Sequence, residues 1–221
     1  FVKLVSPLFQ SVAEISEGEI FLLAIENQHL FREFLEDLYA GAEGGEVKTV
    51  LSQNNAPIPI RGNIDIRANF APFEINTRHL LAAITSQLEK KAVDEENYLK
   101  TVEIIHSAEK YAEELCFDFP FRAECNITPQ SFVKGLHVTA ADDAETDIER
   151  IFQYMELVMH FSAHKLFVFV NFRSFFDDSD LIELYKYVKS KQMRILLLES
   201  TGRKSICGIK QIIIDSDLCE F

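Results

Sequence analysis

Cysteine is scarce in this 221-residue chain, and its four copies show neither a C-x-x-C pairing nor the spacing of a disulfide framework. In a chain of this length they fit free thiols in a reducing cytosol. No apolar run approaches the roughly 18 residues that a membrane-spanning helix needs. No basic and then apolar stretch typical of a secretion signal opens the sequence. We therefore expect a cytoplasmic protein without membrane association.

Signatures of nucleotide hydrolysis and nucleophilic catalysis are also missing. A phosphate loop needs G-x-x-x-x-G-K-[ST], whose glycines let backbone amides approach phosphates closely. The nearest stretch, STGRKSICG at 200–208, lacks the first glycine and has Arg203 where the second belongs. The segment LAIENQHLFREF at 23–34, where such a loop would sit, has no glycine. No G-x-S-x-G elbow occurs. The sequence predicts no enzyme activity and no bound nucleotide.

Positive charge is in the minority, with 22 basic against 35 acidic residues and a formal net charge of -13. Such a chain should repel DNA unless its bases are gathered in one place. They cluster in four groups: Lys90 and Lys91; Lys100 and Lys110; Lys186, Lys189, Lys191 and Arg194; Arg203 and Lys204. Scattered solubilising charges and a DNA-facing stripe are both consistent with this pattern.

The apolar content, 48% with 19 phenylalanines, is enough for a sizeable core. In the first half, apolar spacing predicts a buried strand at 18–27, a helix ending at Gly41, a strand at 46–52, and short strand and loop over 54–72. Two helical patterns follow, from Asn76 or Thr77 to about 91 and from 97 to 115. Their join has no glycine or proline, so they form either a hairpin or one bent rod. We expect a helical projection.

The second half predicts a parallel β-α-β unit. A compact helix is capped by Thr128 and Pro129 and ends at Gly135. A long helix starts in the acidic run at 142. The unit itself comprises strand 165–172, helix 178–190 and strand 194–199, and a last strand lies within 211–218. Asn171 ends the first strand of the unit, where many nucleotide hydrolases carry a Mg²⁺-binding acid.

The acidic run DDAETDIE at 142–149 has two interpretations. It can be a solvated helix start whose charges suit the helix dipole. It can also be a site for a hard cation, because clustered carboxylate oxygens are what Ca²⁺ prefers. The EF-hand pattern is absent.

The order of these elements resembles the short form of the CRISPR-associated ring protein of type II-A systems. The resemblance is strongest from Asp118 to the end. It rests on FEINTRHLLAAITSQLE (73–89), KGLHV (134–138), DAETDIERIFQYMELV (143–158), KLFVFVNF (165–172), DDSDLIELYKYVKSKQMRILLLES (177–200) and QIIIDSDL (211–218).

The resemblance implies an α/β fold: a degenerate P-loop-NTPase-like head with a mostly parallel sheet, over 1–75 and 118–221, and an α-helical leg over 76–117. It implies homotetrameric rings with a basic channel that bind double-stranded DNA ends without sequence preference. It also implies Ca²⁺ as the cofactor. The expected partners are the CRISPR integrase complex and the type II effector nuclease, during spacer acquisition.

Site residues follow from the acidic run, the basic groups and the resemblance. The expected calcium ligands are Asp118, Glu124, Asp142, Asp143 and Glu149, although Pro120, Phe121 and Arg122 follow Asp118 where the family has acids. The expected DNA contacts are Lys90, Lys91, Lys100, Lys110, Lys186, Lys189, Lys191, Arg203 and Lys204. The alternative functions are a divalent-metal-dependent nuclease or cryptic NTPase using the acidic cluster, and a pure protein-interaction scaffold.

Overall fold

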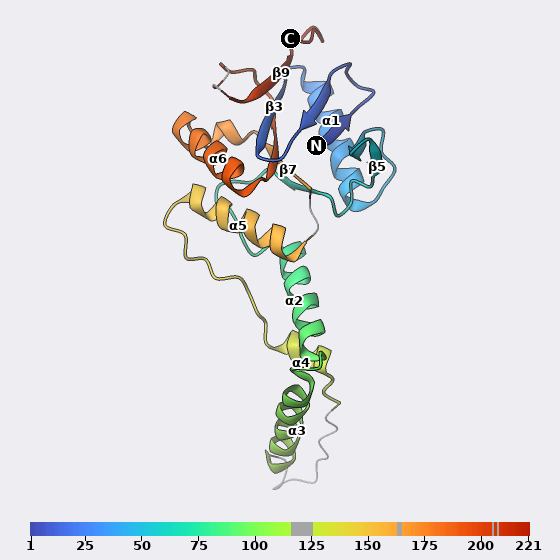
Figure 1. Ribbon diagram of the computed structural model, residues 1–221, viewed down its shortest axis with the longest axis vertical. Helices are drawn as coiled ribbons and strands as arrows, with labels where there is room; N and C mark the ends of the chain where they lie inside the picture. Colours follow the sequence, from blue (N-terminus) through green and yellow to red (C-terminus); the bar gives the residue numbers. More distant parts are fainter. Residues whose placement is uncertain (116–125, 163–164, 205, 207) are drawn as a thin grey trace. The chain divides into compact units, whose positions relative to one another are not determined.

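The chain divides into two compact units in the computed structural model, which describes residues 1–115, 126–162, 165–204, 206 and 208–221 (Figure 1). The first unit comprises Phe1–Glu74 and Ala144–Phe221, and the second comprises Ile75–Asp143.

A five-stranded parallel sheet forms the centre of the first unit. Its strands are β3 (Glu19–Ile25), β6 (Ile64–Arg67), β7 (Leu166–Val170), β8 (Arg194–Glu199) and β9 (Lys210–Ile214). They lie in the order β6-β7-β8-β3-β9 with every pair parallel. Every residue of β7 and β8 is buried, as expected of a sheet covered on both faces. The predicted mixed α/β class and the parallel pairing of β7 with β8 are confirmed.

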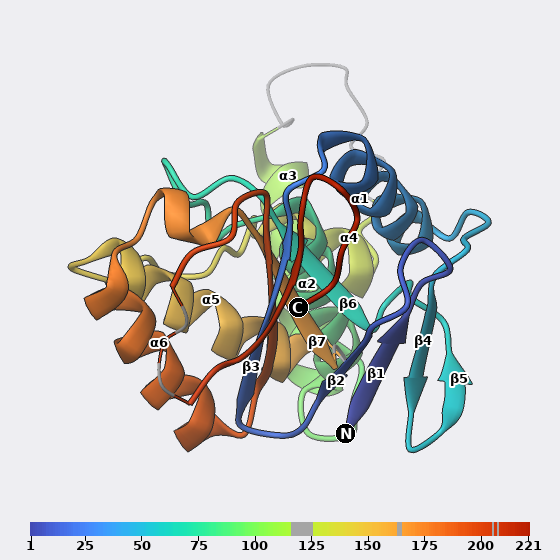
Figure 2. The same cartoon turned by 90° about the horizontal axis from the view of Figure 1, so that it is seen from above.

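A second, antiparallel sheet covers one face of the first together with α1 (Gln28–Glu43) (Figure 2). Its strands are β1 (Val2–Val5), β2 (Val12–Ile15), β4 (Val50–Gln53) and β5 (Ala56–Ile58), in the order β2-β1-β4-β5. The sequence did not predict β1 and β2, which have only four residues each. The prediction that the first helix ends at Gly41 is wrong, because α1 continues to Glu43 and Gly44 caps it at φ 88°.

Two helices cover the other face of the parallel sheet, α5 (Asp147–Phe161) and α6 (Asp178–Lys191), with the short 3-10 helix η1 (Phe172–Ser174) before α6 (Figure 2). The long helix predicted from residue 142 begins five residues later. The reason is a capping box, in which the Thr146 hydroxyl accepts from the Glu149 amide and the Glu149 carboxylate accepts from the Thr146 amide.

A cluster of phenylalanine rings fills the space beside β7. Phe70, from the segment after β6, is almost fully buried and lies within 5.9 Å, centroid to centroid, of five other phenylalanine rings. These rings come from Phe73, Phe169, Phe172, Phe175 and Phe176. The cluster therefore fixes the segment after β6 against β7 and η1.

The second unit consists of α2 (Arg78–Ala92), α3 (Tyr98–Leu115) and α4 (Pro129–Gly135). Thr77 caps α2 and Thr128 caps α4, as predicted. The predicted leg, residues 76–117, lies in this unit as far as its residues are described. Residues 126–143, which we assigned to the head, also belong here. The cause is local packing: α4 contacts α2, and the Asn76 side chain exchanges two hydrogen bonds with the backbone of Ala140, at 2.8 and 3.0 Å.

Candidate nucleic-acid interface

The carboxyl edge of the parallel sheet is where open α/β sheets usually bind ligands. Here Glu26 and Asn27 alone separate β3 from α1. The Asn27 side-chain oxygen accepts hydrogen bonds from the His29 and Leu30 amides, both at 3.1 Å. The Glu26 carboxylate accepts from the Gly202 amide at 3.0 Å. A phosphate at this helix start would meet amides that are already bonded and a carboxylate of its own sign, so the edge is unsuited to nucleotide phosphates.

Asn171, at the end of β7, has a structural role in this arrangement. Its backbone is left-handed, at φ 54° and ψ 37°, a conformation that asparagine tolerates better than most residues. Its side-chain oxygen accepts a hydrogen bond from the Ser200 amide at 2.8 Å, and its amide donates to the Leu198 carbonyl at 2.8 Å. Asn171 therefore connects the end of β7 to the end of β8 by two hydrogen bonds.

A buried pair of charged residues lies beside it. Glu199 is 3% exposed and accepts from the Arg173 amide at 3.1 Å. Burial raises the pKa of Glu199, although that hydrogen bond and the positive charges of Arg173 and Arg203 act in the opposite direction. The Arg173 guanidinium donates to Asp178 at 2.9 Å and to the Lys204 carbonyl at 3.3 Å. Because these groups bond one another, they hold the chain after β8 in place.

Sequence reasoning missed Glu26, Arg173 and Glu199. One signal was present for Glu199, because an acid that closes the apolar run ILLLE is expected to find a partner when buried. Nothing in the sequence paired it with Arg173, because the contact forms only when β7 and β8 lie side by side.

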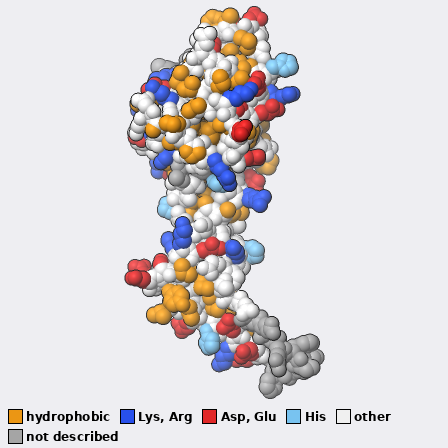
Figure 3. Space-filling view, turned by 90° about the vertical axis from the view of Figure 1, so that its right-hand side faces the viewer, with side chains coloured by type: hydrophobic (Ala, Val, Ile, Leu, Met, Phe, Trp, Pro, Cys, Tyr) orange, Lys and Arg blue, Asp and Glu red, His pale blue; other side chains and the backbone are white. Residues whose placement is uncertain are grey.

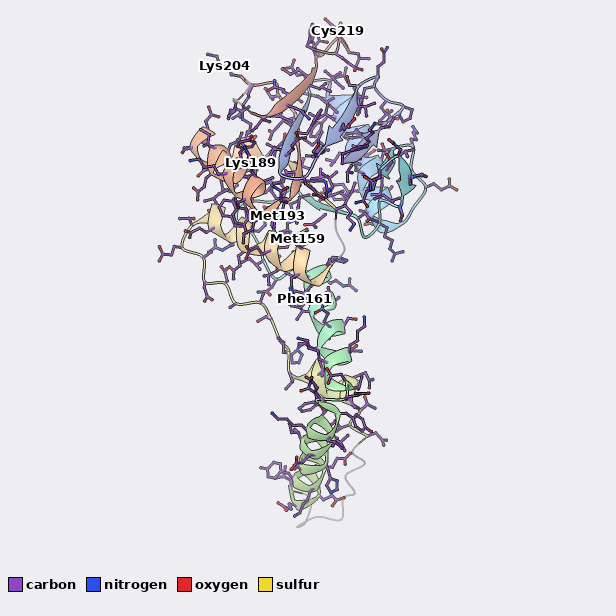
Figure 4. All side chains as sticks on the ribbon, viewed as in Figure 1. Met159, Phe161, Lys189, Met193, Lys204 and Cys219 are labelled. Atoms are coloured by element: carbon purple, nitrogen blue, oxygen red, sulfur yellow. The ribbon has the colours of Figure 1, made fainter. Side chains whose placement is uncertain are left out.

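Three of the expected DNA contacts are exposed on the side of the first unit where α6 lies (Figure 4). Lys186 and Lys189 are exposed on the last turns of α6. Tyr185, also on α6, has its hydroxyl 3.0 Å from the place of a β-carbon on Gly208. Lys189 lies over the Tyr185 ring, 5.9 Å from its centroid. Lys204, on that loop, is also exposed, and Figure 4 shows it and Lys189 on this side.

Three other basic residues of the expected groups in the first unit already have partners. Lys191 forms an ion pair with Glu156, and the buried Arg194 pairs with Glu17 at 2.6 Å. Arg203 is exposed but donates a hydrogen bond to the Arg173 carbonyl. The face shown in Figure 3 carries basic side chains mixed with acidic ones. The α6 side, defined here by Lys186, Lys189 and Lys204, is therefore the best candidate for a phosphate contact in this unit.

The second unit carries four of the expected contacts, all exposed. Lys90 and Lys91 lie in the last turn of α2. Lys100 and Lys110 share a face of α3 with Glu103 and Glu114, because these positions follow one another at helical spacings of three, seven and four residues. Acids therefore interrupt the lysines on α3.

A comparison with models of protein families shows the family of this chain. The model of the family described as CRISPR-associated protein (Cas_Csn2) matches residues 43–218, from the end of α1 through β9. The chain belongs to the Cas_Csn2 family. Among solved structures, a Pyrococcus furiosus protein described as the ATP-binding protein of an ABC transporter is 12% identical over 95% of this chain and 96% of its own, with a TM-score of 0.39. A likeness this low carries no argument.

The calcium site that we expected from the sequence does not assemble from the described residues alone. Asp118 and Glu124 lie outside them. In the ranges that the structure describes, no group of three or more histidine, cysteine, aspartate or glutamate side chains is placed to hold a metal. Asp142 and Asp143 precede α5, and Glu149 uses one carboxylate oxygen for the amides of residues 145 and 146, at 3.0 and 3.1 Å. Helix capping thus accounts for part of the acidic run.

Among the residues described for this Cas_Csn2 protein, no helix is both long and apolar enough to cross a membrane.

Proposed function

We propose that this CRISPR-associated protein is a non-enzymatic, sequence-independent binder of double-stranded DNA ends. It acts as a homotetrameric ring in spacer acquisition, as a short-form type II-A member of its family. The observation that carries the proposal is the α6 side, where Lys186, Lys189 and Lys204 are exposed and form no ion pair with an acid among the described residues, on a chain of net charge -13. Binding needs only a local row of bases, because release of condensed counterions from the phosphates supplies the free energy.

The carboxyl end of β3 supports the proposal that the protein is not an enzyme. β3 lies between β8 and β9, so the strand order reverses there, and such a switch point is the usual ligand site of an open α/β sheet. Glu26, Asn27 and the helix start close it to phosphates. We propose that the first unit is a P-loop-type head that has lost its nucleotide site and serves as a scaffold.

The charge distribution supports loading from an end. Four chains carry 4 × -13 = -52 formal charges, so an acidic exterior would repel duplex that approaches from the side. A basic lumen would accept an end that is threaded into it. Ca²⁺ would offset carboxylates near that path. The proposed setting is the cytoplasm, beside the CRISPR integrase complex and the type II effector nuclease.

The test is a gel-shift series with linear and closed-circular duplex of equal length, with Ca²⁺ or with a chelator, accompanied by the solution mass. We expect a tetramer that retains linear duplex in preference to circular duplex, and more strongly with Ca²⁺. Equal competition by the two forms would overturn end binding. A monomer that ignores DNA would overturn the whole proposal.

A matched pair of double variants locates the DNA-binding surface. Lys186→Ala with Lys189→Ala removes two exposed lysines of the α6 side. Lys3→Ala with Lys48→Ala removes the same charge from lysines paired with Glu14 and Glu33 at 3.3 and 2.9 Å. We expect only the first pair to lower the salt dependence of binding, by about 0.9 in logarithmic slope for each phosphate that the protein no longer neutralises. Equal effects would show that net charge alone matters.

The rival function is a divalent-metal-dependent nuclease or a cryptic NTPase. The same samples test it when they are assayed for nucleotide turnover and DNA cleavage with Mg²⁺. Activity that Asp143→Asn or Asp147→Asn abolishes would support the rival and overturn the non-enzymatic proposal.

A further inference from the structure

The loop Ser200–Lys204, which follows β8, is held by side chains from two other strand ends. Asn171, after β7, accepts from the Ser200 amide at 2.8 Å. Glu26, after β3, accepts from the Gly202 amide at 3.0 Å. The amides of Ser200 and Gly202 are therefore both hydrogen-bonded, and Lys204 follows two residues after the second of them.

Gly202 and Glu26 fit each other closely. A β-carbon on Gly202 would lie 2.8 Å from a carboxylate oxygen of Glu26 and 3.3 Å from the Ile213 side chain. The first distance is shorter than real β-carbon contacts, so a larger residue would have to displace the end of the Glu26 side chain. Glycine at this position leaves room for the carboxylate at its present distance of 3.0 Å from the amide.

The carboxylate of Glu26 acts on a nearby phosphate in two opposite ways. Its negative charge repels a phosphate, which weakens DNA binding. Its hydrogen bond orders the loop, which lowers the entropic cost of presenting Lys204 in one geometry. Two substitutions of Glu26 can separate these effects. Glutamine keeps an acceptor oxygen but has no charge, whereas alanine has neither the acceptor nor the charge.

We infer that Glu26, through its hydrogen bond to Gly202, is a positioning residue that presents Lys204 to a DNA phosphate. The inference rests on the proposed DNA binding and adds to it a named phosphate-binding side chain and the residues that shape it. Lys204 is the group that meets the phosphate. Glu26 acts through the loop and does not touch DNA.

The experiment compares four single variants of the full chain, Glu26→Gln, Glu26→Ala, Gly202→Ala and Lys204→Ala, in binding to linear duplex over a range of salt concentrations. We expect Glu26→Gln to bind at least as tightly as the wild type, with the same salt slope. We expect Lys204→Ala to lose about eightfold at about 0.1 M salt and about 0.9 of the slope, the effect of one phosphate contact. We expect Glu26→Ala and Gly202→Ala to lose affinity with a smaller change of slope, because Lys204 keeps its charge and loses only its fixed geometry.

Gly202→Ala is the sharpest variant, because its β-carbon pushes the Glu26 carboxylate from its place at the Gly202 amide without changing any charge. Its matched control is Gly135→Ala, at the end of α4, where a β-carbon would meet nothing within 4 Å. We expect the control to bind DNA like the wild type. In the Lys204→Ala background, Glu26→Ala should cause no further loss of affinity, because the lysine that it positions is already gone and only the repulsion by the carboxylate is removed.

The inference is overturned if Glu26→Ala binds DNA as tightly as Glu26→Gln. In that case the carboxylate would affect DNA binding only through its negative charge. It is also overturned if the effects of Glu26→Ala and Lys204→Ala on affinity add. A wild-type protein that does not retain DNA would overturn the proposed function and the inference with it. If the wild type retains DNA and the Gly202→Ala variant binds it with the same affinity, the inference alone would be overturned.

Discussion

Asn171 stands where a nucleotide hydrolase would place an acid, and replacing it separates its conformational role from its hydrogen bond. Asn171→Ala removes the side-chain oxygen that the Ser200 amide uses at 2.8 Å and leaves a residue with a β-carbon at φ 54°. Asn171→Gly removes the same oxygen but adopts the left-handed conformation freely. Asn171→Asp keeps an acceptor oxygen and tolerates that conformation.

The expected magnitudes follow from these differences. One hydrogen bond contributes about 1 kcal/mol net, and Ser200 is exposed, so its amide can turn to water when Asn171 is replaced. The left-handed backbone costs alanine about 1–2 kcal/mol more. Alanine should therefore lower the free energy of unfolding by about 2–3 kcal/mol. Glycine, without the hydrogen bond and with a more flexible unfolded chain, should lower it by about 1–2 kcal/mol. Aspartate should stay within about 0.5 kcal/mol of the wild type.

The assay is urea denaturation followed by far-ultraviolet circular dichroism, with the midpoint compared at unchanged slope. The melting temperature of the alanine variant should fall by roughly 4–12 °C. A glycine variant less stable than the alanine variant would refute the conformational part of the reasoning, and an aspartate variant as unstable as alanine would refute the hydrogen-bond part. Asn171→Asp also introduces an acid at the end of a buried strand, where many nucleotide hydrolases carry one, and we expect it to hydrolyse no ATP because the helix start after β3 is closed to phosphate.

Three further predictions concern stability. Phe70→Ala, which empties the centre of the phenylalanine cluster, should cost about 3–5 kcal/mol by urea denaturation, and Phe70→Leu less. Glu199→Gln cannot ionise, whereas the wild type loses stability as pH rises from the ordinary pKa of glutamate, about 4.3, to the raised pKa of Glu199. The variant should therefore gain stability relative to the wild type as pH rises above about 4.3, and a change in the opposite direction would refute the assigned shift. Thr146→Ala should cost about 1 kcal/mol because it removes the cap of α5, with Thr146→Ser close to the wild type in thermal melts.

Features that depend on neighbouring residues were predictable from the sequence, and features that depend on distant ones were not. The β7-α6-β8 unit and the caps at Thr77 and Thr128 follow from apolar spacing and from side chains that bond amides three residues away. The bond between Glu26 and Gly202 joins residues 176 positions apart, and only the folded sheet brings them together. The ion pair between Arg194 and Glu17 also joins residues far apart in the sequence. The sequence therefore grouped Arg194 with the exposed lysines of α6, although it is buried and paired.

The carboxyl edge of the sheet has hydrogen-bonding groups that a bound ligand commonly satisfies in α/β proteins. In this protein Glu26, Asn27, Asn171 and Arg173 satisfy them instead. Residues 200–204 are held by these bonds, so the proposed contact of Lys204 with a phosphate carries a smaller ordering cost. The same argument separates the two candidate functions: adding nucleotide should leave the melting temperature of the protein unchanged, whereas short linear duplex should raise it with its concentration. A rise with ATP and none with duplex would reverse the assignment.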